Sequence, residues 1–399
     1  MIISPNILGN IFTSSHPSGC YTQVNRYIEY AQHWNINTTP KRILVIGSSM
    51  GYGLASRIVS SFRFSSPTVG VFHERPAIGN RTATAGWYNT AAFTEKAREQ
   101  NIPAYNINGD AFSDETKHKT INCIQNNFDG KIDLVIYSVA APRRFDKATQ
   151  TTYKSSIKPI GKTFKTKTLN IETGQITIDS IEPANNKEIK ETISVMGGSD
   201  WQQWINTLNE NNLLEDDFQT VAYSYIGPEI IAPIYKNGTL GIAKRHLEKK
   251  AQQITQSLKS INGKAVVSIN MALATQSSAV IPSISLYISI LRKVMHSKGF
   301  QEDIMDQMIR LFTNHLYNPY WLDNNMSHLI RLDNQEMHPS IQKEVRIIWN
   351  DITSNNLDVL SAFSQYKKNF YQNFGFSVKG VDYNQLVDPH VPCPVYNCR

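Results

Sequence analysis

A tyrosine and a lysine stand nine positions apart in the stretch IYKNGTLGIAK, at Tyr235 and Lys244. At about 100° per residue, their side chains would leave one unbroken helix in opposite directions. The Asn237-Gly238 pair between them is a turn signal, and Thr239 can cap a helix that continues through Lys244. We therefore expect a bend that aims both side chains into one cleft.

Such a pair would suit proton transfer beside a bound cofactor. A lysine ammonium close to a tyrosine favours the phenolate form, which makes the hydroxyl a better proton donor near neutral pH. The lysine can also hold the ribose of a nicotinamide cofactor. Spacing alone leaves a coincidental pair open, because the chain contains 18 tyrosines.

A glycine-rich loop supports the cofactor interpretation. In VIGSSMGYGLASR, Gly47, Gly51 and Gly53 follow an apolar strand and open a helix. Glycines allow a tight turn and let the backbone approach a pyrophosphate, whose charge sits at the start of the helix. A phosphate-binding loop of the P-loop type would need a lysine here, and none is present. A purely structural turn remains the alternative.

Further polar and small residues stand where strands are expected to end. Glu74 can bind the ribose hydroxyls of adenosine and repel a 2′-phosphate, which favours NADH over NADPH. Arg75 beside it could instead partner a phosphate, and Glu74 could be an ordinary surface carboxylate. The other positions at strand ends are Asp110, Ala111, Ser138, Val139 and Ala140.

The elements that must position these residues alternate between short apolar runs and longer amphipathic stretches. This pattern predicts one large α/β domain over residues 1–399, built on a doubly wound, Rossmann-type parallel sheet. We expect residues 40–150 and 218–300 to form the dinucleotide-binding core, with strands at 42–46, 68–74 and 131–138. Residues 300–399 should form a helical part packed on that core.

Between residues 151 and 198 the pattern changes. Apolar and polar residues alternate on both sides of a Thr173-Gly174 turn, which predicts a β-hairpin insertion. Ser113 should cap one helix, and Ser199 with Gln202 should form the capping box of another. The apolar stretch 281–299 is read as a core helix or as a substrate-lining helix.

Composition excludes several classes of protein. With 399 residues and 41% hydrophobic content the chain can bury a large core. The sequence shows no secretory leader pattern and no apolar run long enough for a membrane span, so we expect a cytoplasmic protein. Its four cysteines are too scattered for a disulfide framework. Cys393 and Cys398 are read as free thiols, with a metal or redox pair as the alternative.

Basic residues exceed acidic residues by 40 − 33 = 7. An anionic partner is therefore plausible, although no nucleic-acid-binding signature is present. A solvated face is one reading of the densest cluster, and a landing surface for a phosphate-bearing or acidic-protein-bound substrate is the other. Its members are Arg143, Arg144, Lys147, Lys154, Lys158, Lys162, Lys165 and Lys167.

Several motifs together carry a family resemblance. They are GSSMGYGLASR, SVAAPRR, VMGGSDWQQW, the Tyr-x8-Lys of YKNGTLGIAK, ATQSSAVIP and FGFSVKGVDY. With them the chain resembles the TER reductase family, the FabV-type trans-2-enoyl-ACP/CoA reductases that use NADH. The resemblance runs from HPSGC near the N-terminus to the last 20 residues.

The resemblance implies roles for individual residues. Tyr235 would be the proton donor, Lys244 a cofactor contact, and Tyr225 a contact to the enoyl thioester, although Tyr225 could also be a strand-end core residue. His73 stands where relatives often carry an aromatic side chain. The expected cofactor-binding residues are Gly47, Ser48, Ser49, Met50, Gly51, Tyr52, His73, Glu74, Asp110, Ala111, Val139, Ala140, Lys244, Leu273, Ala274 and Thr275.

The implied activity is reduction of the trans-2 double bond of enoyl thioesters by NADH, on acyl carrier protein or coenzyme A. A short-chain-type carbonyl reductase would use the same tyrosine, and a non-catalytic NADH-binding sensor would use the same cofactor site. We expect no metal, no nucleic-acid partner and a monomeric chain.

Overall fold

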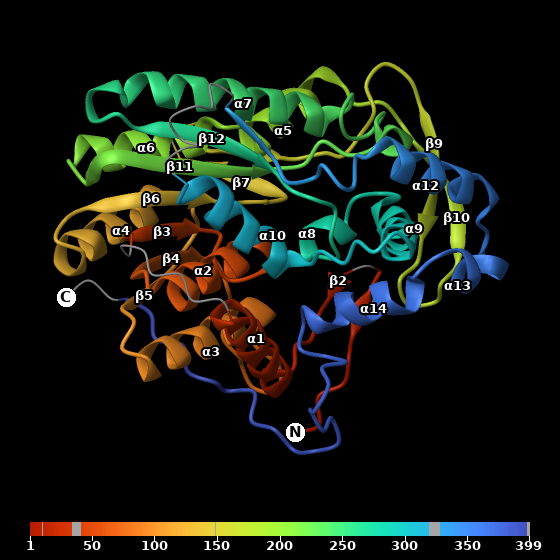
Figure 1. Cartoon of the computed structure of the whole chain (residues 1–399), viewed down its shortest axis with the longest axis horizontal. Helices are drawn as coiled ribbons and strands as arrows, with labels where there is room; N and C mark the ends of the chain where they lie inside the picture. Colours follow the sequence, from red (N-terminus) through yellow and green to blue (C-terminus); the bar gives the residue numbers. More distant parts are fainter. Residues whose placement is uncertain (10, 34–40, 148, 319–327, 397–399) are drawn as a thin grey trace.

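The structure is a computed structural model that describes residues 1–9, 11–33, 41–147, 149–318 and 328–396. Its centre is a parallel sheet of seven strands (Figure 1). Every pairing within this sheet is parallel. In spatial order the strands are β5 (Ala104–Asn108), β4 (Thr68–Phe72), β3 (Ile43–Ile46), β6 (Ile132–Tyr137), β11 (Leu214–Ser224), β12 (Lys264–Ile269) and β13 (Leu329–Arg331).

The strand order confirms the predicted doubly wound sheet. After β3, the next strands in the chain, β4 and β5, lie in order on one side of β3. The following strand, β6, lies on the other side of β3. The order therefore reverses between β3 and β6, and ligands of such sheets bind at the carboxyl ends beside this reversal. All four residues of β3 are buried, as expected for a strand covered on both faces.

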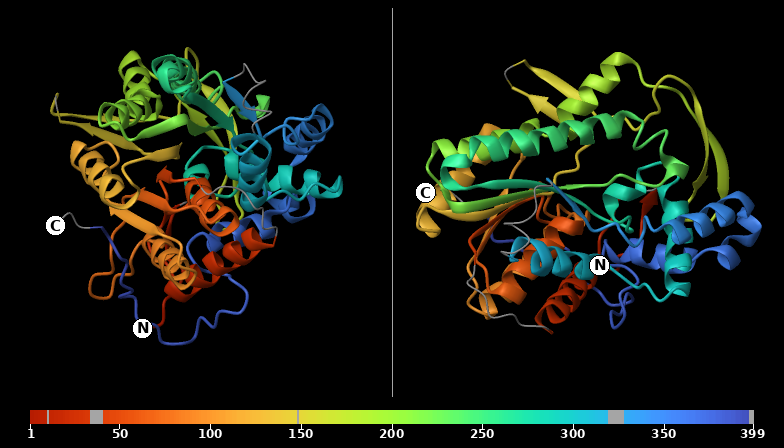
Figure 2. Two further views of the ribbon diagram at one scale, coloured as in Figure 1. Left: turned by 60° about the vertical axis from the view of Figure 1, so that its left-hand side comes forward. Right: turned by 45° about the horizontal axis from the view of Figure 1, so that its top comes forward.

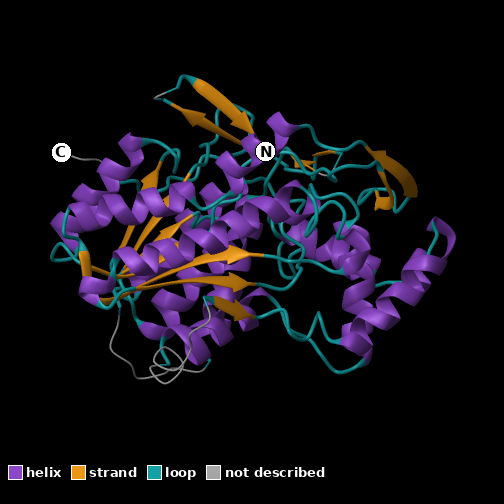
Figure 3. Ribbon diagram, turned by 90° about the horizontal axis from the view of Figure 1, so that it is seen from above, coloured by secondary structure: helices purple, strands orange, loops and turns teal. Residues whose placement is uncertain are grey.

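Helices cover both faces of the sheet (Figure 3). One face packs against α4 (Asp114–Asn127), α6 (Ser199–Glu210) and α7 (Thr239–Ser257). The other face packs against α1 (Pro17–Gln32), α2 (Gly51–Phe64), α3 (Ala85–Glu99) and α10 (Ile304–Leu311).

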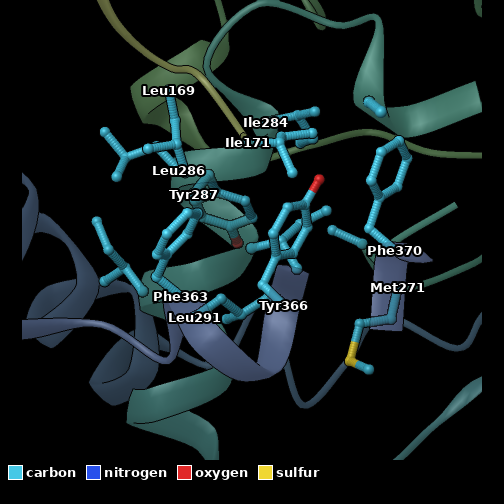
Figure 4. Close-up of a cluster of buried hydrophobic side chains, with 14 of the residues drawn as sticks. Leu169, Ile171, Met271, Ile284, Leu286, Tyr287, Leu291, Phe363, Tyr366 and Phe370 are labelled. Atoms are coloured by element: carbon cyan, nitrogen blue, oxygen red, sulfur yellow. The ribbon is translucent and has the colours of Figure 1, made fainter. Parts of the chain in front are cut away.

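A third apolar cluster lies beyond the carboxyl ends of the strands (Figures 1 and 2). Figure 4 shows its centre, where Tyr287 and Leu291 of one helix lie beside Phe363 and Tyr366 of another. The stretch 281–299 is thus largely a core helix, as one of its two readings predicted. The elements of this part are β9 (Phe164–Leu169), β10 (Ile176–Ile181), α8 (Gln276–Ala279), α9 (Ile284–Ser297), α12 (Pro339–Asp351), α13 (Leu357–Leu360) and α14 (Phe363–Gln372).

The insertion differs in part from its prediction. The hairpin around Thr173-Gly174 is confirmed as β9 paired with β10. A second hairpin, β7 (Arg143–Asp146) with β8 (Thr151–Lys154), and helix α5 (Asn186–Met196) were not predicted. Strand β7 has a single apolar residue, Phe145, so its sequence signal is weak. Helix α5 does carry a local signal, the capping box of Asn185 and Glu188, which the prediction overlooked.

Helix caps were predicted with mixed success. Ser113 does cap α4, since its side chain accepts from the backbone N–H of Thr116. The predicted capping box of Ser199 and Gln202 is wrong, because Gly198 is the N-cap of α6 and the Gln202 N–H donates to its carbonyl. The helix therefore starts at Ser199 itself.

Short elements complete the chain. They are β1 (Ile7–Leu8), β2 (Ile11–Phe12), η1 (Glu229–Ile231), η2 (Lys259–Ile261), η3 (Phe312–Leu316) and η4 (Ser354–Asn356). After α14 the chain returns along α3, where the Trp87 indole donates to Val391 and the Tyr88 hydroxyl donates to Pro389. None of the described helices combines the length and the apolar character that a membrane crossing requires.

Candidate functional site

The glycine loop lies at the reversal of the strand order. Its backbone is held to β4, because the N–H groups of Gly47 and Ser48 both donate to Val71. A Cβ at Gly53 would lie 1.8 Å from the Gly47 carbonyl oxygen, so only glycine fits there. Helix α2 starts at Gly51 with no side-chain cap on its free N–H groups. These donors and the open backbone fit the pyrophosphate of a dinucleotide.

Glu74 lies directly beside this loop. Its carboxylate accepts a hydrogen bond from the Ser49 hydroxyl at 2.7 Å, and its backbone N–H donates to Asn108. Burial raises the pKa of Glu74, while hydrogen bonds from Thr84 and Ser49 oppose that rise. Glu74 is thus held against the glycine loop, and its contact with ribose hydroxyls stays a prediction.

The remaining predicted cofactor residues lie along the same edge of the sheet. His73 is exposed after β4, and Ala140 is exposed after β6. The Thr275 side chain would lie 3.9 Å from a Cβ on Gly51, so the segment after β12 comes close to the glycine loop. The partly buried members are Met50, Gly51, Tyr52, Asp110, Ala111, Val139, Leu273, Ala274 and Thr275. Their contacts with a dinucleotide stay predictions.

The predicted bend between the tyrosine and the lysine is present. Tyr235 lies in a turn, where its backbone carbonyl accepts hydrogen bonds from the N–H groups of Gly238 and Gly241. Helix α7 begins only after this turn, at Thr239. Gly238, not Thr239, is the N-cap. The Thr239 hydroxyl instead donates to the carbonyl of Ser156, which ties α7 to the insertion.

Both side chains reach the end of strand β11. The ring of Tyr235 packs edge-on against the ring of Tyr225, with centroids 5.0 Å apart. The ammonium group of Lys244 lies 3.4 Å from the carbonyl oxygen of Tyr223. Tyr235, the predicted proton donor, and Lys244, the predicted cofactor contact, therefore both lie next to the end of β11.

Electrostatics at Tyr235 differ from the prediction. Burial and the negative charge of Glu336 raise the pKa of the Tyr235 hydroxyl above its ordinary value, so the phenolate is disfavoured. Burial also lowers the pKa of Lys244 to about 8, against the opposing effect of Glu248. The lysine therefore does not make Tyr235 acidic here, and the tyrosine keeps its proton at neutral pH.

Sequence reasoning missed one group at this site. Glu336 follows β13 and is fully buried. It accepts hydrogen bonds from the hydroxyls of Tyr225 and Tyr287 and from the backbone N–H of Ala272. The only sequence signal was an acidic residue shortly after a short apolar run. Tyr225, at the end of β11, therefore has a buried polar partner, and its contact with the enoyl thioester stays a prediction.

Part of the predicted basic cluster has structural roles. Lys158 pairs with Glu188 at 2.6 Å, and Arg144 lies over the Phe112 ring and donates to the Ser194 carbonyl. Lys167 donates to three carbonyl groups at the C-terminal end of α12. The exposed members are Arg143, Lys147, Lys154, Lys162 and Lys165.

Other groups that can carry chemistry are scarce in the described part of the chain. No cluster of three or more His, Cys, Asp or Glu side chains there has the arrangement of a metal site. Among the described residues Cys20, Cys123 and Cys393 form no disulfide, which for Cys393 agrees with the predicted free thiol. Cys398 lies outside the described residues.

The doubly wound sheet, with a glycine loop at the reversal of its strand order, defines the class of this protein: it is an α/β oxidoreductase of the NAD(P)H-binding type. Three family models match the chain and narrow the class further. They are the trans-2-enoyl-CoA reductase catalytic region over residues 81–317, the NAD(P)H binding domain of trans-2-enoyl-CoA reductase over 2–79, and the enoyl reductase FAD binding domain over 323–387. The chain belongs to the trans-2-enoyl-CoA reductase family.

Curated relatives agree with this assignment. The chain is 46% identical to an enoyl-acyl-carrier-protein reductase (NADH) of Coxiella burnetii over 390 residues, which cover 97% of this chain and 96% of the relative. It is 45% identical to a trans-2-enoyl-CoA reductase (NADH) of Ruminiclostridium cellulolyticum, with 98% of each chain covered.

Solved structures show the same fold. The trans-2-enoyl-CoA reductase of Clostridium acetobutulicum in complex with NADH matches with a TM-score of 0.93 and 40% identity, covering 98% of both chains. The Treponema denticola enzyme in complex with NAD matches with a TM-score of 0.93 and 38% identity over the full length of both chains.

The third family model is that of an FAD binding domain. Within the described residues 328–387, Tyr366, Phe370 and Phe374 are buried, with the rings of Phe370 and Phe374 5.5 Å apart and those of Tyr366 and Phe370 6.4 Å apart in parallel. These three rings therefore offer no exposed face for a flavin to stack on, whereas Trp349, Tyr371 and Tyr383 are partly buried.

Proposed function

We propose that this chain reduces the trans-2 double bond of enoyl thioesters with NADH, and that Tyr235 is the residue that meets the developing charge. The observation that carries the proposal is a buried tyrosine, Tyr235, whose ring packs on Tyr225 at the carboxyl edge of a dinucleotide-binding sheet. The names of relatives that share 45–46% identity support the same reaction.

The residues have distinct roles in this reaction. Bound NADH supplies a hydride, which reaches the β-carbon of the enoyl group. Negative charge then gathers on the thioester oxygen, and the Tyr235 hydroxyl donates a hydrogen bond to it in a cleft from which apolar side chains exclude water. The α-carbon finally takes up a proton to give the saturated acyl chain.

The cofactor would be held from both sides of the groove. Gly47 to Tyr52 would receive the pyrophosphate at the start of α2, and Glu74 would accept from the ribose hydroxyls. Lys244 would contact the nicotinamide half, and Leu273 to Thr275 would flank it. Because the Glu74 carboxylate beside this loop would repel a 2′-phosphate, NADH would be preferred over NADPH.

A groove between β9 and α12 fits the carrier of the acyl chain. It has a volume of about 790 Å³ and is lined by the basic Lys165 and Arg346 together with apolar residues. Ile230, which also lines it, lies five positions before Tyr235. Acyl carrier protein and coenzyme A both carry phosphate, so a basic groove next to the catalytic turn suits either. The single Glu229 in the lining already pairs with Lys236.

The carrier proposal is tested by comparing crotonyl-CoA with crotonyl-pantetheine, which lacks the phosphates. Replacing Lys165 and Arg346 by Gln should lower kcat/KM for crotonyl-CoA and leave crotonyl-pantetheine nearly unchanged. Lys154→Gln, on exposed β8, is the matched control. An equal loss of kcat/KM with both substrates would show that the groove does not bind the phosphates of the carrier.

The reaction itself is tested by the absorbance of NADH. Wild-type protein should oxidise NADH with crotonyl-CoA and not with acetoacetyl-CoA, since a carbonyl reductase would prefer the second. Tyr235→Phe should lower the rate about 10²–10³-fold and still bind NADH. Tyr153→Phe, on the β8 hairpin strand, should behave as wild type. NADH binding without turnover of any enoyl thioester would favour a sensor instead.

The cytoplasmic location and the monomeric state expected from the sequence remain part of this proposal. Size-exclusion chromatography with light scattering measures the second directly.

A further inference from the structure

A buried carboxyl group lies behind the substrate tyrosine. Glu336 is fully buried, and its Oε1 accepts hydrogen bonds from the hydroxyls of Tyr225 and Tyr287, each at 2.8 Å. Its Oε2 accepts from the backbone N–H of Ala272 at 2.7 Å. Among the described residues no lysine, arginine or histidine forms an ion pair with it. The carboxyl group is therefore satisfied entirely by neutral donors.

These donors come from three separate parts of the fold. Tyr225 extends from the end of β11 and touches Tyr235. Ala272 directly precedes the segment expected to flank the nicotinamide, and Tyr287 lies on α9 in the apolar cluster of Figure 4. Glu336 thus connects the substrate side, the cofactor side and the helical part that covers them.

The two tyrosine partners of Glu336 are not equivalent. The Tyr287 oxygen already accepts a hydrogen bond from the Gln342 amide at 2.9 Å. The Tyr225 hydroxyl also lies within hydrogen-bonding reach of the Tyr287 hydroxyl, but it has no counterpart of the Gln342 amide among the described residues. A proton placed on Oε1 of Glu336 would therefore be accepted more readily by the Tyr225 oxygen than by the Tyr287 oxygen.

The charged and titratable groups around Glu336 keep both the protonated and the ionised carboxyl group accessible near neutral pH. Burial is the main cause that raises its pKa to about 7, and the charge of Asp333 adds to the rise. Arg331 on β13 is paired with Asp333, which limits its effect on Glu336. The phenol groups of Tyr52 and Tyr235 also face its charge, and burial keeps both protonated.

We propose that Glu336 is a positioning residue whose proton sets the direction of the Tyr225 hydroxyl. With ionised Glu336, Tyr225 donates to the carboxylate and offers the cleft only lone pairs, which repel a thioester oxygen. With protonated Glu336, the carboxyl group donates to the Tyr225 oxygen, and the tyrosine hydrogen turns toward the thioester oxygen. The proton comes from water, and no covalent bond changes. This inference rests on the proposed function and on the contact of Tyr225 with the enoyl thioester that the family resemblance implies.

The test is the pH dependence of KM for crotonyl-CoA at saturating NADH. In the wild type, KM should be constant below a midpoint near neutrality and rise up to tenfold per pH unit above it. Glu336→Gln and Tyr225→Phe should each give a KM that does not change over this range. Glu344→Gln, on α12 and paired with Lys298, is the matched control and should follow the wild type. A wild-type profile in Glu336→Gln would overturn the inference.

A second variant separates this role from a structural one. Tyr287→Phe removes one donor to the carboxylate and leaves the Tyr225 contact, so the ionised form is less stable. The midpoint should therefore move upward by about one pH unit. A merely structural role predicts a changed rate with an unmoved midpoint, which would contradict the inference.

Binding without turnover supplies an independent readout. Calorimetric binding of butyryl-CoA, a saturated thioester, should weaken above the same midpoint in the wild type and not in Glu336→Gln. Unchanged NADH affinity in each variant shows that the fold is intact. If the wild type consumed no NADH with any enoyl thioester, the proposed function would fail. If it were active with a flat KM profile, only this inference would fail.

Discussion

The ring of Tyr225 meets the ring of Tyr235 edge-on, with centroids 5.0 Å apart and planes inclined by 73°. The first tyrosine extends from the end of a central strand, and the second lies in the turn before α7. Such a contact is worth about 0.5–1.5 kcal/mol beyond the burial of the rings, and it fixes the position of one ring relative to the other. The orientation of the Tyr225 side chain therefore influences the position of Tyr235, the proposed proton donor.

Lys244 should give NADH binding a characteristic pH dependence. Burial lowers its pKa to about 8, so the ammonium loses its proton as the pH rises through that value. KM for NADH should be constant below about pH 8 and increase above it, because the neutral amine contacts the cofactor more weakly. Lys244→Arg stays charged, so its KM for NADH should remain flat.

Lys249→Arg, on the exposed side of the same helix, is the control and should keep the wild-type profile. This NADH effect is separate from the thioester effect of Glu336, since the two appear in different KM values. A wild-type KM for NADH that stays constant up to pH ~10 would show that Lys244 does not contact the cofactor.

Gly53→Ala should weaken the binding of NADH more than it lowers the stability of the fold. An added Cβ would lie 1.8 Å from the Gly47 carbonyl oxygen, so the glycine loop must shift away from α2. We expect at least a tenfold weaker Kd for NADH by fluorescence titration, since the shift breaks the donor arrangement at the helix start. Gly299→Ala is the control: its φ of +81° makes alanine strained there, but nothing lies within 4 Å of the added Cβ and NADH should bind normally. Equal affinities of the two variants would contradict the assigned loop.

The sequence was sufficient for the parts of the site whose signals are local. The glycine loop follows a strand of four apolar residues, and the bend before Lys244 follows from an Asn-Gly turn within a few positions. Both were predicted because turn chemistry and strand burial act over short distances along the chain.

Glu336 could not be predicted in this way. Its partners Tyr225 and Tyr287 lie 111 and 49 positions away, and no periodic pattern marks the turn in which it lies. The acidity of Tyr235 was mispredicted for the same reason. Spacing suggested that a lysine would dominate its environment, whereas burial and a distant carboxylate do so.

The buried pair of Lys117 and Asp200 should be important for stability. Their side chains are 3% and 2% exposed and lie 3.0 Å apart, and the Tyr137 hydroxyl donates to the same carboxylate. Lys117→Met would leave a buried carboxylate without its cation, so we expect a loss of about 3–5 kcal/mol in the free energy of unfolding. Urea denaturation measures it.

Lys119→Met on the same helix removes an exposed ion pair with Glu115 and serves as the control. Its urea midpoint should stay close to that of the wild type, because solvent screens exposed pairs. Similar losses in both variants would mean that the buried pair contributes no more than a surface pair.

The raised pKa of Glu336 also predicts how stability changes with pH. In the unfolded chain the carboxyl group ionises near its model value of 4.5, whereas burial raises its pKa to about 7 in the folded chain. Between these values the folded protein holds a proton that the unfolded chain has lost. The resulting stabilisation is fully present below about pH 4.5 and disappears as the pH rises through about 7. Relative to Glu336→Gln, the wild type should therefore lose about 3 kcal/mol of unfolding free energy between these two pH values.

Urea unfolding of both proteins at a series of pH values measures this difference, with Glu344→Gln as the control at the surface of α12. The comparison with Glu336→Gln is informative because every other titrating group is the same in the two proteins and cancels. A constant difference would mean that Glu336 has the same pKa in the folded and unfolded chains. In that case its three neutral donors would offset the whole cost of burial, and the Tyr225 hydroxyl would be held by a permanent carboxylate.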